Sequence, residues 1–392
     1  MSELKVNSIK GTGASTAAIT IDSSSGGCTA NITNNLSNKN LIINGAVNVA
    51  QRGSTSTTNN GPQTADRFGK GTNTTDDTPL QEQVDVASGT TPYTLGFRKA
   101  YKITNGNQTS GAQATTRVVI EYKIEAQDLA TSGWNYLSST SYITFSYWVK
   151  SSVAQNFYNT FTTDDGTSQR YVTETGSLSA DTWTKITKTI PGNSNLTFNN
   201  DNGEGLEITW ECFRGTSQTG TRPLNAWAAA DNNTRTPDQT STWYTTNDAT
   251  FEITGVQLEV GSVATDFEHR SFAKELALCQ RYYLRLGDKA LIYYTIGNID
   301  GGNEAQTFIN FPTEMRVAPT SLETSGTASD YFLRVNSNQT CTSVPSLSGD
   351  NKTTRSCEVI FRANSHGFSN GQCCFGRAAN TTDSFLGFSA EL

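Results

Sequence analysis

Residues that commonly carry out chemistry are sparse in this 392-residue chain. It has two histidines: His269 lies in an Asp-Phe-Glu-His-Arg stretch and His366 in a Ser/Gly/Asn-rich loop. No HExxH, GxSxG or Walker-type motif occurs, and no pair of CxxC motifs. The neighbouring Cys373 and Cys374 would alternate between the two faces of a strand, which favours separate thiols over a metal or redox site. These residues give no positive indication of metal, redox or nucleophilic catalysis.

Paired carboxylates are the arrangement that most needs weighing, because glycoside hydrolysis uses two of them. The candidate pairs are Asp76/Asp77, Asp164/Asp165 and Glu207/Glu211. The aspartate pairs lie in turn-like sequence, where aspartate commonly makes local hydrogen bonds. The two glutamates alternate with apolar residues, which is typical of the solvent face of a strand. We therefore expect no catalytic residues and no enzymatic activity.

Aromatic residues in polar loops are better candidates for contact with a ligand. The loop Arg214–Asp248 carries Trp227, Trp243 and Tyr244, whose apolar faces could stack on sugars. The alternative is that these rings close one end of a β-sandwich or form a subunit contact. A second group of rings lies among turn residues of the C-terminal region, namely Tyr293, Tyr294, Tyr331, Phe332 and Phe368. From that group we take Tyr331 and Phe368 as ligand candidates.

A structural calcium ion is the only cofactor that the sequence brings into question. Jelly-roll sandwiches often bind Ca²⁺ through side-chain and backbone oxygens, and Asp66, Gln257 and Glu259 could supply such oxygens. A solvated polar face is the alternative reading of these three residues. The seven cysteines are odd in number and scattered, so we expect free thiols.

Composition predicts a folded, all-β protein. Hydrophobic residues make up 35% and charged residues 17%, while 14 Tyr, 18 Phe and 6 Trp supply apolar area and 33 Gly suit turns. The net charge of −7, without a long basic run, argues against nucleic acid as a partner. No apolar stretch reaches the roughly 20 residues of a membrane span, and the N-terminus lacks the apolar core of a signal peptide. We expect neither membrane insertion nor Sec-type secretion.

The chain divides into four predicted segments: 1–40, 41–270, 271–287 and 288–392. The first segment has two short stretches of alternating apolar and polar residues, which cannot fold alone and are expected to dock on another chain. Its docking residues are Leu4, Val6, Ile9, Ile19 and Ile21. Segments 41–270 and 288–392 show recurrent period-2 runs separated by turns, so we predict a jelly-roll β-sandwich and a smaller C-terminal β domain.

One short helix is predicted between these β domains, over Ser271–Tyr283. Ser271 can cap it, and an apolar stripe is formed by Phe272, Leu276, Cys279 and Tyr283. This stripe could meet its symmetry mates on the axis of a homotrimer. The alternative is that it packs against its own sandwich.

Two groups of motifs resemble known families. The stretch Tyr142–Ser152 (YITFSYWVKSS), followed by Asp181–Ile190 (DTWTKITKTI), resembles the paired strands of carbohydrate-binding-module-like jelly rolls. That resemblance implies that Trp148 and Trp183 are core residues rather than sugar platforms.

The second group resembles bacteriophage tail fibres and virion structural proteins. It comprises Leu41–Gly53, Ala65–Phe68, Phe251–Gly261, Phe267–Arg270 and Glu275–Tyr283, while Ser2–Ile9 and Phe388–Leu392 fit phages of marine bacteria. The resemblance implies a virion protein made in the host cytoplasm, docked through its N-terminus on other tail or virion proteins. The leading interpretation is a trimeric tail fibre or adhesin whose region 288–392 binds a bacterial surface glycan or outer-membrane receptor. The alternatives are a head-decoration or tail-structural protein without a receptor role, and a glycan depolymerase tailspike.

Overall fold

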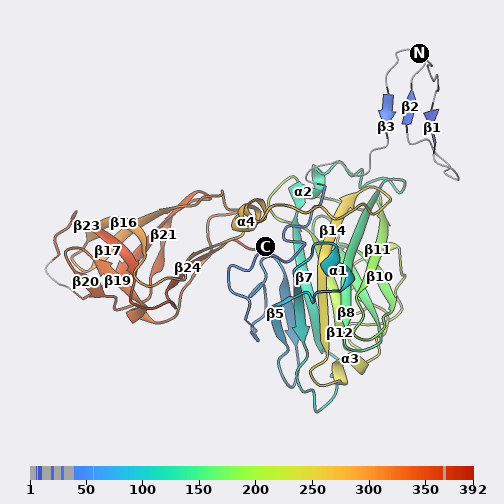
Figure 1. Cartoon of the computed structure of the whole chain (residues 1–392), viewed down its shortest axis with the longest axis horizontal. Coiled ribbons are helices and arrows are strands. Elements are labelled where there is room, and N and C mark those ends of the chain that lie inside the picture. Colours follow the sequence, from blue (N-terminus) through green and yellow to red (C-terminus); the bar gives the residue numbers. More distant parts are fainter. Residues whose placement is uncertain are drawn as a thin grey trace.

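The computed structural model describes residues 6, 8–10, 19–21, 28–30, 39–55, 57–364 and 368–392. Within these residues the chain is mostly β, its strand ladders are antiparallel and its helices are few and short (Figure 1). The predicted all-β class is confirmed. No helix in the described part of the chain is long and apolar enough to cross a membrane.

The segment predicted as a sandwich forms two antiparallel sheets. The six-stranded sheet has the order β13 (Trp227–Ala229), β10 (Gln169–Ser177), β9 (Asn156–Thr163), β12 (Glu204–Arg214), β7 (Arg117–Glu125) and β4 (Gly69–Asn73). The five-stranded sheet has the order β11 (Thr184–Pro191), β8 (Tyr142–Ser151), β14 (Thr250–Val260), β6 (Lys99–Thr104) and β5 (Leu80–Asp85). The two sheets face each other across one hydrophobic core.

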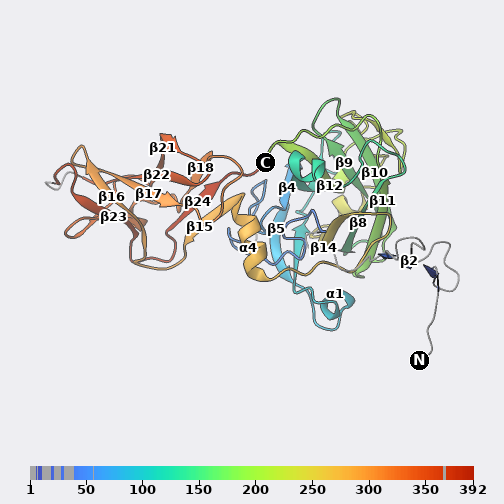
Figure 2. The ribbon, with the colours of Figure 1, turned by 90° about the horizontal axis from the view of Figure 1, so that it is seen from above.

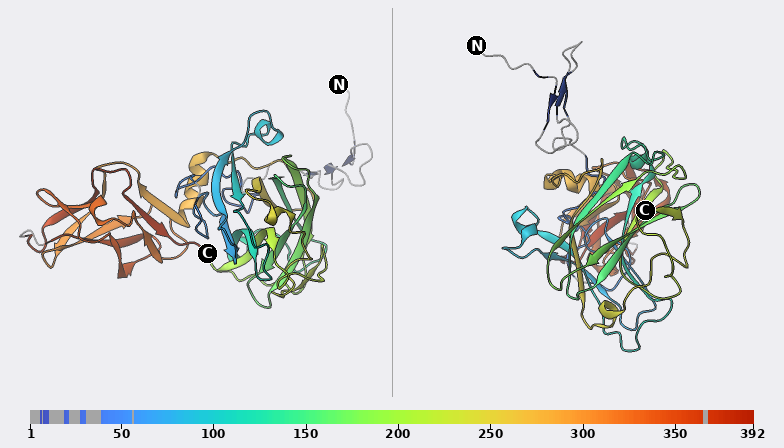
Figure 3. Two further views of the ribbon diagram at one scale, coloured as in Figure 1. Left: turned by 90° about the horizontal axis from the view of Figure 1, so that it is seen from below. Right: turned by 90° about the vertical axis from the view of Figure 1, so that its right-hand side faces the viewer.

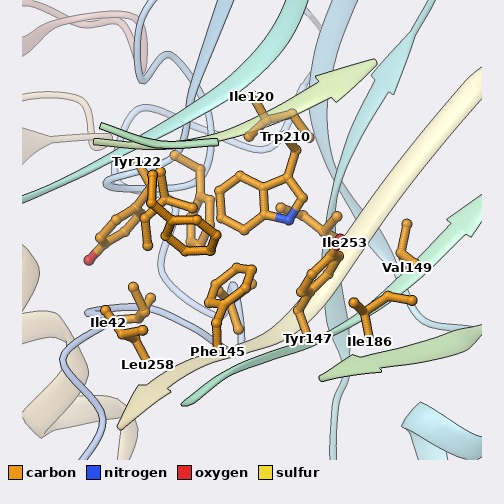
Figure 4. Packing of buried hydrophobic residues seen from close by; sticks show 14 of the residues in the cluster. Ile42, Ile120, Tyr122, Phe145, Tyr147, Val149, Ile186, Trp210, Ile253 and Leu258 are labelled. Atoms are coloured by element: carbon orange, nitrogen blue, oxygen red, sulfur yellow. The ribbon is translucent and has the colours of Figure 1, made fainter. Parts of the chain in front are cut away.

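Alternation along the strands fills this core from both sheets (Figure 4). Trp210 of β12 is fully buried, and its ring centroid lies 5.7 Å from that of Phe145 and 5.8 Å from that of Tyr147, both on β8. Phe68 approaches the same indole from the loop before β4. Such clustered rings bury large apolar areas, which is how a chain of modest hydrophobic content stabilises a sandwich.

The expectation that Trp148 and Trp183 lie in the core between the two sheets is wrong. On β8 the side chains of Phe145, Tyr147 and Val149 enter the core, so alternation points Trp148 outward. Trp148 and Trp183 are both half-buried on the outer side of the five-stranded sheet, in a satellite cluster around Phe97.

The C-terminal region forms two further sheets. A three-stranded sheet has the order β15 (Tyr283–Gly287), β24 (Phe385–Ser389) and β18 (Ser321–Glu323). The seven-stranded sheet has the order β20 (Asn338–Thr340), β19 (Tyr331–Arg334), β23 (Cys373–Ala378), β16 (Tyr293–Asp300), β17 (Glu304–Asn310), β22 (Ser356–Arg362) and β21 (Ser346–Lys352). A core separate from that of the sandwich lies within this region.

The predicted helix is present as α4 (Phe272–Gln280), and Figure 2 shows it between the sandwich and the C-terminal sheets. Ser271 caps it by accepting a hydrogen bond from the main-chain N–H of Lys274. The helix ends before the predicted Tyr283, because that residue begins β15 and pairs with Ser389 of β24. Residues 283–287 therefore belong to the C-terminal sheets rather than to a linker. The remaining helices are α1 (Thr91–Thr94), α2 (Ala126–Ala130), α3 (Thr242–Thr245) and a 3₁₀ turn at Ala328–Asp330.

The described part of the N-terminal segment forms a small sheet of its own. Its strands are β1 (Ser8–Ile9), β2 (Ile19–Ile21) and β3 (Cys28–Ala30), in that order. Figures 1 and 3 show this sheet and the C-terminal sheets at different ends of the sandwich. Ile9 is exposed and Val6, Ile19 and Ile21 are half-buried, whereas the predicted docking residue Leu4 lies outside the described residues.

A polar network, here called the joint, connects the sandwich, α4 and the C-terminal sheets. Its members are Arg52, Arg67, Glu125, Arg281, Tyr282, Tyr283 and Glu391. Arg67 pairs with Glu391 and stacks its guanidinium 3.5 Å from the ring centroid of Tyr282. Arg52 pairs with Glu391 at 3.5 Å and lies 3.4 Å above the ring of Tyr283. Most of these residues come from the stretches Leu41–Gly53, Ala65–Phe68 and Glu275–Tyr283, so those stretches build an architectural contact between domains.

Candidate ligand site on the six-stranded sheet

Two of the predicted ligand residues are part of the sandwich core. Trp243 and Tyr244 of α3 are both 0% exposed. The Trp243 indole N–H donates to the carbonyl of Thr250 at 3.0 Å, and the Tyr244 ring stacks on Phe213 at a centroid distance of 4.7 Å. A buried ring offers no face to a sugar, so the prediction that these two residues stack on a sugar is wrong. They close one end of the sandwich, which was the alternative reading.

The other predicted ligand residues are spread over two domains. Trp227 is half-buried on β13, where it packs against Tyr171 and donates from its indole N–H to the carbonyl of Pro191 at 2.7 Å. Tyr331 is 0% exposed in the C-terminal core and donates to the carbonyl of Phe385, so it presents no free ring face. Phe368 is half-buried against the same core. The structure does not bring the five residues together.

The predicted helix stripe is likewise divided. Phe272 is 60% exposed and Leu276 is half-buried, but Cys279 and Tyr283 are 0% exposed within their own chain. The latter two are buried within their own chain, so they cannot meet symmetry mates.

The three calcium candidates have protein partners. The Asp66 carboxylate accepts hydrogen bonds from the main chain and the side chain of Gln51. Glu259 accepts from the side chain of Gln257 at 2.8 Å and from the main chain of Thr265 at 2.9 Å. Among the described residues, no group of three or more His, Cys, Asp or Glu side chains is arranged to hold a metal ion.

The candidate carboxylate pairs make local contacts. Asp76 accepts from the main-chain N–H of Ser110, and Asp165 accepts from the main-chain N–H of Asn199 at 2.8 Å. Glu211 is fully buried beside Arg214, with 2.7 Å between carboxylate and guanidinium. Glu207 is half-exposed on the outer face of the six-stranded sheet.

A shallow polar pocket of about 470 Å³, here called the basin, lies where β4 and β7 meet the long loop that follows β12. Asn73 and Arg117 are direct cross-strand neighbours on β4 and β7. The loop supplies the opposite wall, held in part by a hydrogen bond from the Arg235 N–H to the carbonyl of Gln218. The lining residues are Thr72, Asn73, Arg117, Ser217, Gln218, Asn232, Asn233 and Arg235. Guanidinium, amide and hydroxyl groups dominate the lining, which suits hydrogen bonding to a polar ligand.

Two buried arginines hold the loop in place behind the basin. Arg222 donates to several main-chain carbonyls, including those of Ala228 and Ala229. Arg170 of β10 donates to the carbonyl of Asp231 at 2.6 Å and to the hydroxyl of Thr162 at 2.9 Å. Carbonyl oxygens satisfy hydrogen bonds but do not cancel the full positive charge.

The arginines around the basin influence one another. Burial, together with the charges of Arg235 and Arg222, lowers the pKa of Arg170 to about 10. Burial also lowers the pKa of Arg235, and the nearby charge of Arg214 acts in the same direction. Within the described part of the chain, the Arg235 guanidinium has no hydrogen-bond or ion-pair partner. The site therefore presents a half-buried cation beside exposed amides.

Comparisons with known proteins give only remote similarities. No protein-family model and no curated protein sequence matches the chain. Among solved structures, it is similar to the enzymatically active domain of tailspike protein 4 from bacteriophage CBA120, at 8% identity and a TM-score of 0.30, over 57% of this chain and 22% of that one. It is also similar to a sugar-binding protein from Bacteroides thetaiotaomicron described as putative, at 10% identity and a TM-score of 0.30, over 57% and 100%.

A third similarity is to the N-terminal tandem CBM22 domain from Paenibacillus barcinonensis Xyn10C. Identity is 9% and the TM-score 0.25, over 86% of this chain and 97% of that one. Likenesses this distant do not assign the chain to a family.

The loop Arg214–Asp248, predicted as a ligand loop from its aromatic residues, lines the basin with polar residues that include Arg235. Arg214, Arg222 and Arg235 all lie in the predicted ligand loop, in a chain with a net charge of −7. The same loop also carries Asp231, Asp238 and Asp248, so its formal charge is zero and charge pattern did not single it out. The cross-strand position of Asn73 beside Arg117 depends on a pairing between segments more than 40 residues apart, so it was not accessible from local pattern.

Proposed function

We propose that this chain is a bacteriophage host-attachment protein that binds a bacterial surface glycan through the basin. The observation that carries the proposal is the basin itself, a pocket of about 470 Å³ whose amides and guanidinium groups match the hydroxyl-rich surface of a saccharide. Strand pairing positions Asn73 and Arg117, and main-chain hydrogen bonds hold the loop, so these groups are in place before a ligand arrives. The proposed glycan contact therefore lies on the sandwich, whereas the sequence predicted it on region 288–392.

The place of the protein in a virion, as a trimeric tail fibre or adhesin, is part of the same proposal. The motif resemblance to phage structural proteins supports it. The small sheet β1–β3 supports it too, because strands of two or three residues need a partner for stability. We assign that partner role to other virion proteins, with docking residues that include Ile9, Ile19 and Ile21. Synthesis in the host cytoplasm follows from this proposal.

A shallow polar site with few contacts gives weak binding for a single copy. Three copies on one fibre would raise the avidity about a hundredfold or more, provided that the glycan can reach several sites at once. A weak single site and a multivalent particle are therefore compatible.

The test measures binding of the full chain to immobilised surface polysaccharide from a susceptible bacterium, with polysaccharide from a resistant strain as reference. Asn233 is an exposed lining residue, so Asn233→Trp fills the basin without disturbing the core. Asn195 is an exposed asparagine in another turn, and Asn195→Trp is the matched control. We expect loss of binding for N233W and none for N195W.

A further variant separates the sandwich from the C-terminal region as the receptor contact. Tyr293 of β16 is 51% exposed and stacks against Phe375. If Tyr293→Ala abolishes binding while N233W leaves it intact, the glycan contact lies on region 288–392 instead. If the wild-type chain binds no polysaccharide, the decoration or tail-structural alternative is favoured.

The depolymerase alternative has its own readout, the release of reducing ends from host polysaccharide. We expect none. Docking is tested with a variant that starts at Leu41. It should fold but fail to join particles, and normal occupancy on virions would place the attachment elsewhere.

A further inference from the structure

We infer that the basin selects an acidic saccharide, with the guanidinium groups of Arg235 and Arg117 contacting carboxylate or sulfate groups of the ligand. This inference rests on the proposed glycan-binding function and narrows it to one ligand class. Neutral glycans and acidic glycans make the same hydroxyl contacts, so the distinction depends on the charges in the site.

The first observation is that Arg235 lacks a counter-charge in contact. Its main-chain N–H is fixed to Gln218, which places the residue in the basin wall. In the described residues, no carboxylate lies within ion-pair distance of its guanidinium. Arg117 makes only a 3.4 Å contact with Glu121 on its own strand. A guanidinium has five donors in a planar fork, which suits a carboxylate or sulfate held bidentately.

The second observation is that arginines cluster around the basin, whose described lining residues include Arg117 and Arg235 but no acidic residue. Five arginines surround the basin, namely Arg117, Arg170, Arg214, Arg222 and Arg235. Ion pairs link Arg214 to Glu211 and Arg117 to Glu121. Arg170 and Arg222 are instead bonded to main-chain carbonyls.

Negative groups near the site are already engaged or stand apart from the lining. The exposed Asp231 carboxylate accepts from the N–H of Asn233 and the hydroxyl of Thr234, and it interacts with Arg222 and Arg170. Glu207 lies on the sheet face and acts electrostatically on Arg235. Neither residue lines the basin. A concave site with one prevailing sign attracts ligands of the opposite sign, even on a chain whose net charge is −7.

The experiment titrates the full chain with three probes by calorimetry: a hexamer of galacturonate, a sulfated galactan hexamer and neutral xylohexaose. The first two separate carboxylate from sulfate as the recognised group. We expect at least one acidic probe to bind about tenfold or more tightly than the neutral probe, as a charge-assisted contact predicts. Raising NaCl from 50 to 500 mM should reduce that advantage.

Variants show whether Arg235 is responsible. Arg235→Gln should weaken the acidic probe about tenfold and the neutral probe less than twofold, while Arg235→Lys should retain part of the preference. Lys185, exposed on β11 of the other sheet, supplies the control Lys185→Gln, which removes one positive charge without changing affinity. Thermal unfolding of each variant confirms that it is folded.

The inference is overturned if the neutral probe binds as tightly as both acidic probes, or if R235Q weakens all three equally. Failure of all three probes to bind also overturns it. The glycan-binding function itself is judged separately, on native surface polysaccharide with N233W, so the two failures are distinguishable.

Discussion

The Arg281 guanidinium donates two hydrogen bonds of 2.7 Å to the carboxylate of Glu125. Arg281 follows α4, whereas Glu125 ends β7 in the sandwich and is fully buried. Tyr282 and Gln127 donate to the same carboxylate. One acidic side chain therefore collects four donors from both sides of the joint.

Loss of this carboxylate should destabilise the protein. We expect Glu125→Ala to lower the free energy of unfolding by about 3–5 kcal/mol, since it leaves Arg281 and Tyr282 without their acceptor in a largely buried site. Urea denaturation followed by tryptophan fluorescence measures the change. Glu314→Ala is the control, because its pair with Arg355 is solvent-exposed, at 48% for Glu314 and 78% for Arg355, and should contribute little to stability. Equal effects of the two variants would contradict a special role for the joint.

Trp243 should matter for stability and not for ligand binding. Trp243→Ala removes a fully buried indole and is expected to cost about 3–5 kcal/mol of unfolding free energy. Trp243→Phe keeps most of the apolar volume, so it should fold and bind surface polysaccharide within twofold of the wild type. A folded W243F protein that no longer binds would restore the sugar-contact interpretation of this residue.

Asp66 should make stability depend on pH below neutrality. Burial raises its pKa from the usual 3.8 to about 6, so the native state holds this proton more tightly than the unfolded chain. The contribution of Asp66 is thus fully present below pH 4 and is lost as the pH rises through 6. The two values differ by about two units, or about 3 kcal/mol.

Asp66→Asn removes the titrating group and serves as the comparison. The free energy of unfolding of D66N minus that of the wild type should rise by about 3 kcal/mol between pH 4 and pH 7. A difference that stays constant over this range would show that Asp66 keeps an ordinary pKa in the folded protein.

A homotrimer remains a prediction, although two residues of the predicted helix stripe are buried and cannot contribute to the subunit contact. Light scattering should give three times the 42.4 kDa monomer mass at micromolar concentration. Phe272 is a large apolar side chain left 60% exposed at the start of α4, so Phe272→Asp should shift the mass toward the monomer. A monomer mass for the wild-type chain would argue strongly against the trimer.

Local pattern was sufficient for the β class and for the helix start. The helix start was predictable because Ser271 is a capping residue and a 3.6-residue periodicity follows it. The helix end was not, since β15 begins only where β24, about 100 residues later, provides hydrogen-bond partners. The small N-terminal sheet has a third strand, Cys28–Ala30, which was not predicted because its sequence is too short to show alternation.

Exposure of aromatic rings was the least predictable property. Trp243 lies in a polar loop sequence, yet α3 turns its indole into the core. In the strand that contains Trp148, alternate residues face the core, and the sequence alone does not say whether Trp148 is among them. The choice of face is made by the opposing sheet, through contacts such as Trp210 with Phe145 and Tyr147.

The position of β14 has a consequence for biosynthesis. This strand is the last of the sandwich strands in sequence, yet it lies between β8 and β6, pairing with both. Until residues 250–260 leave the ribosome, the five-stranded sheet stays split, with two unpaired strand edges exposed. Such long-range pairing slows folding and leaves edges open to aggregation. Truncation before residue 250 should therefore yield insoluble protein rather than a smaller sandwich.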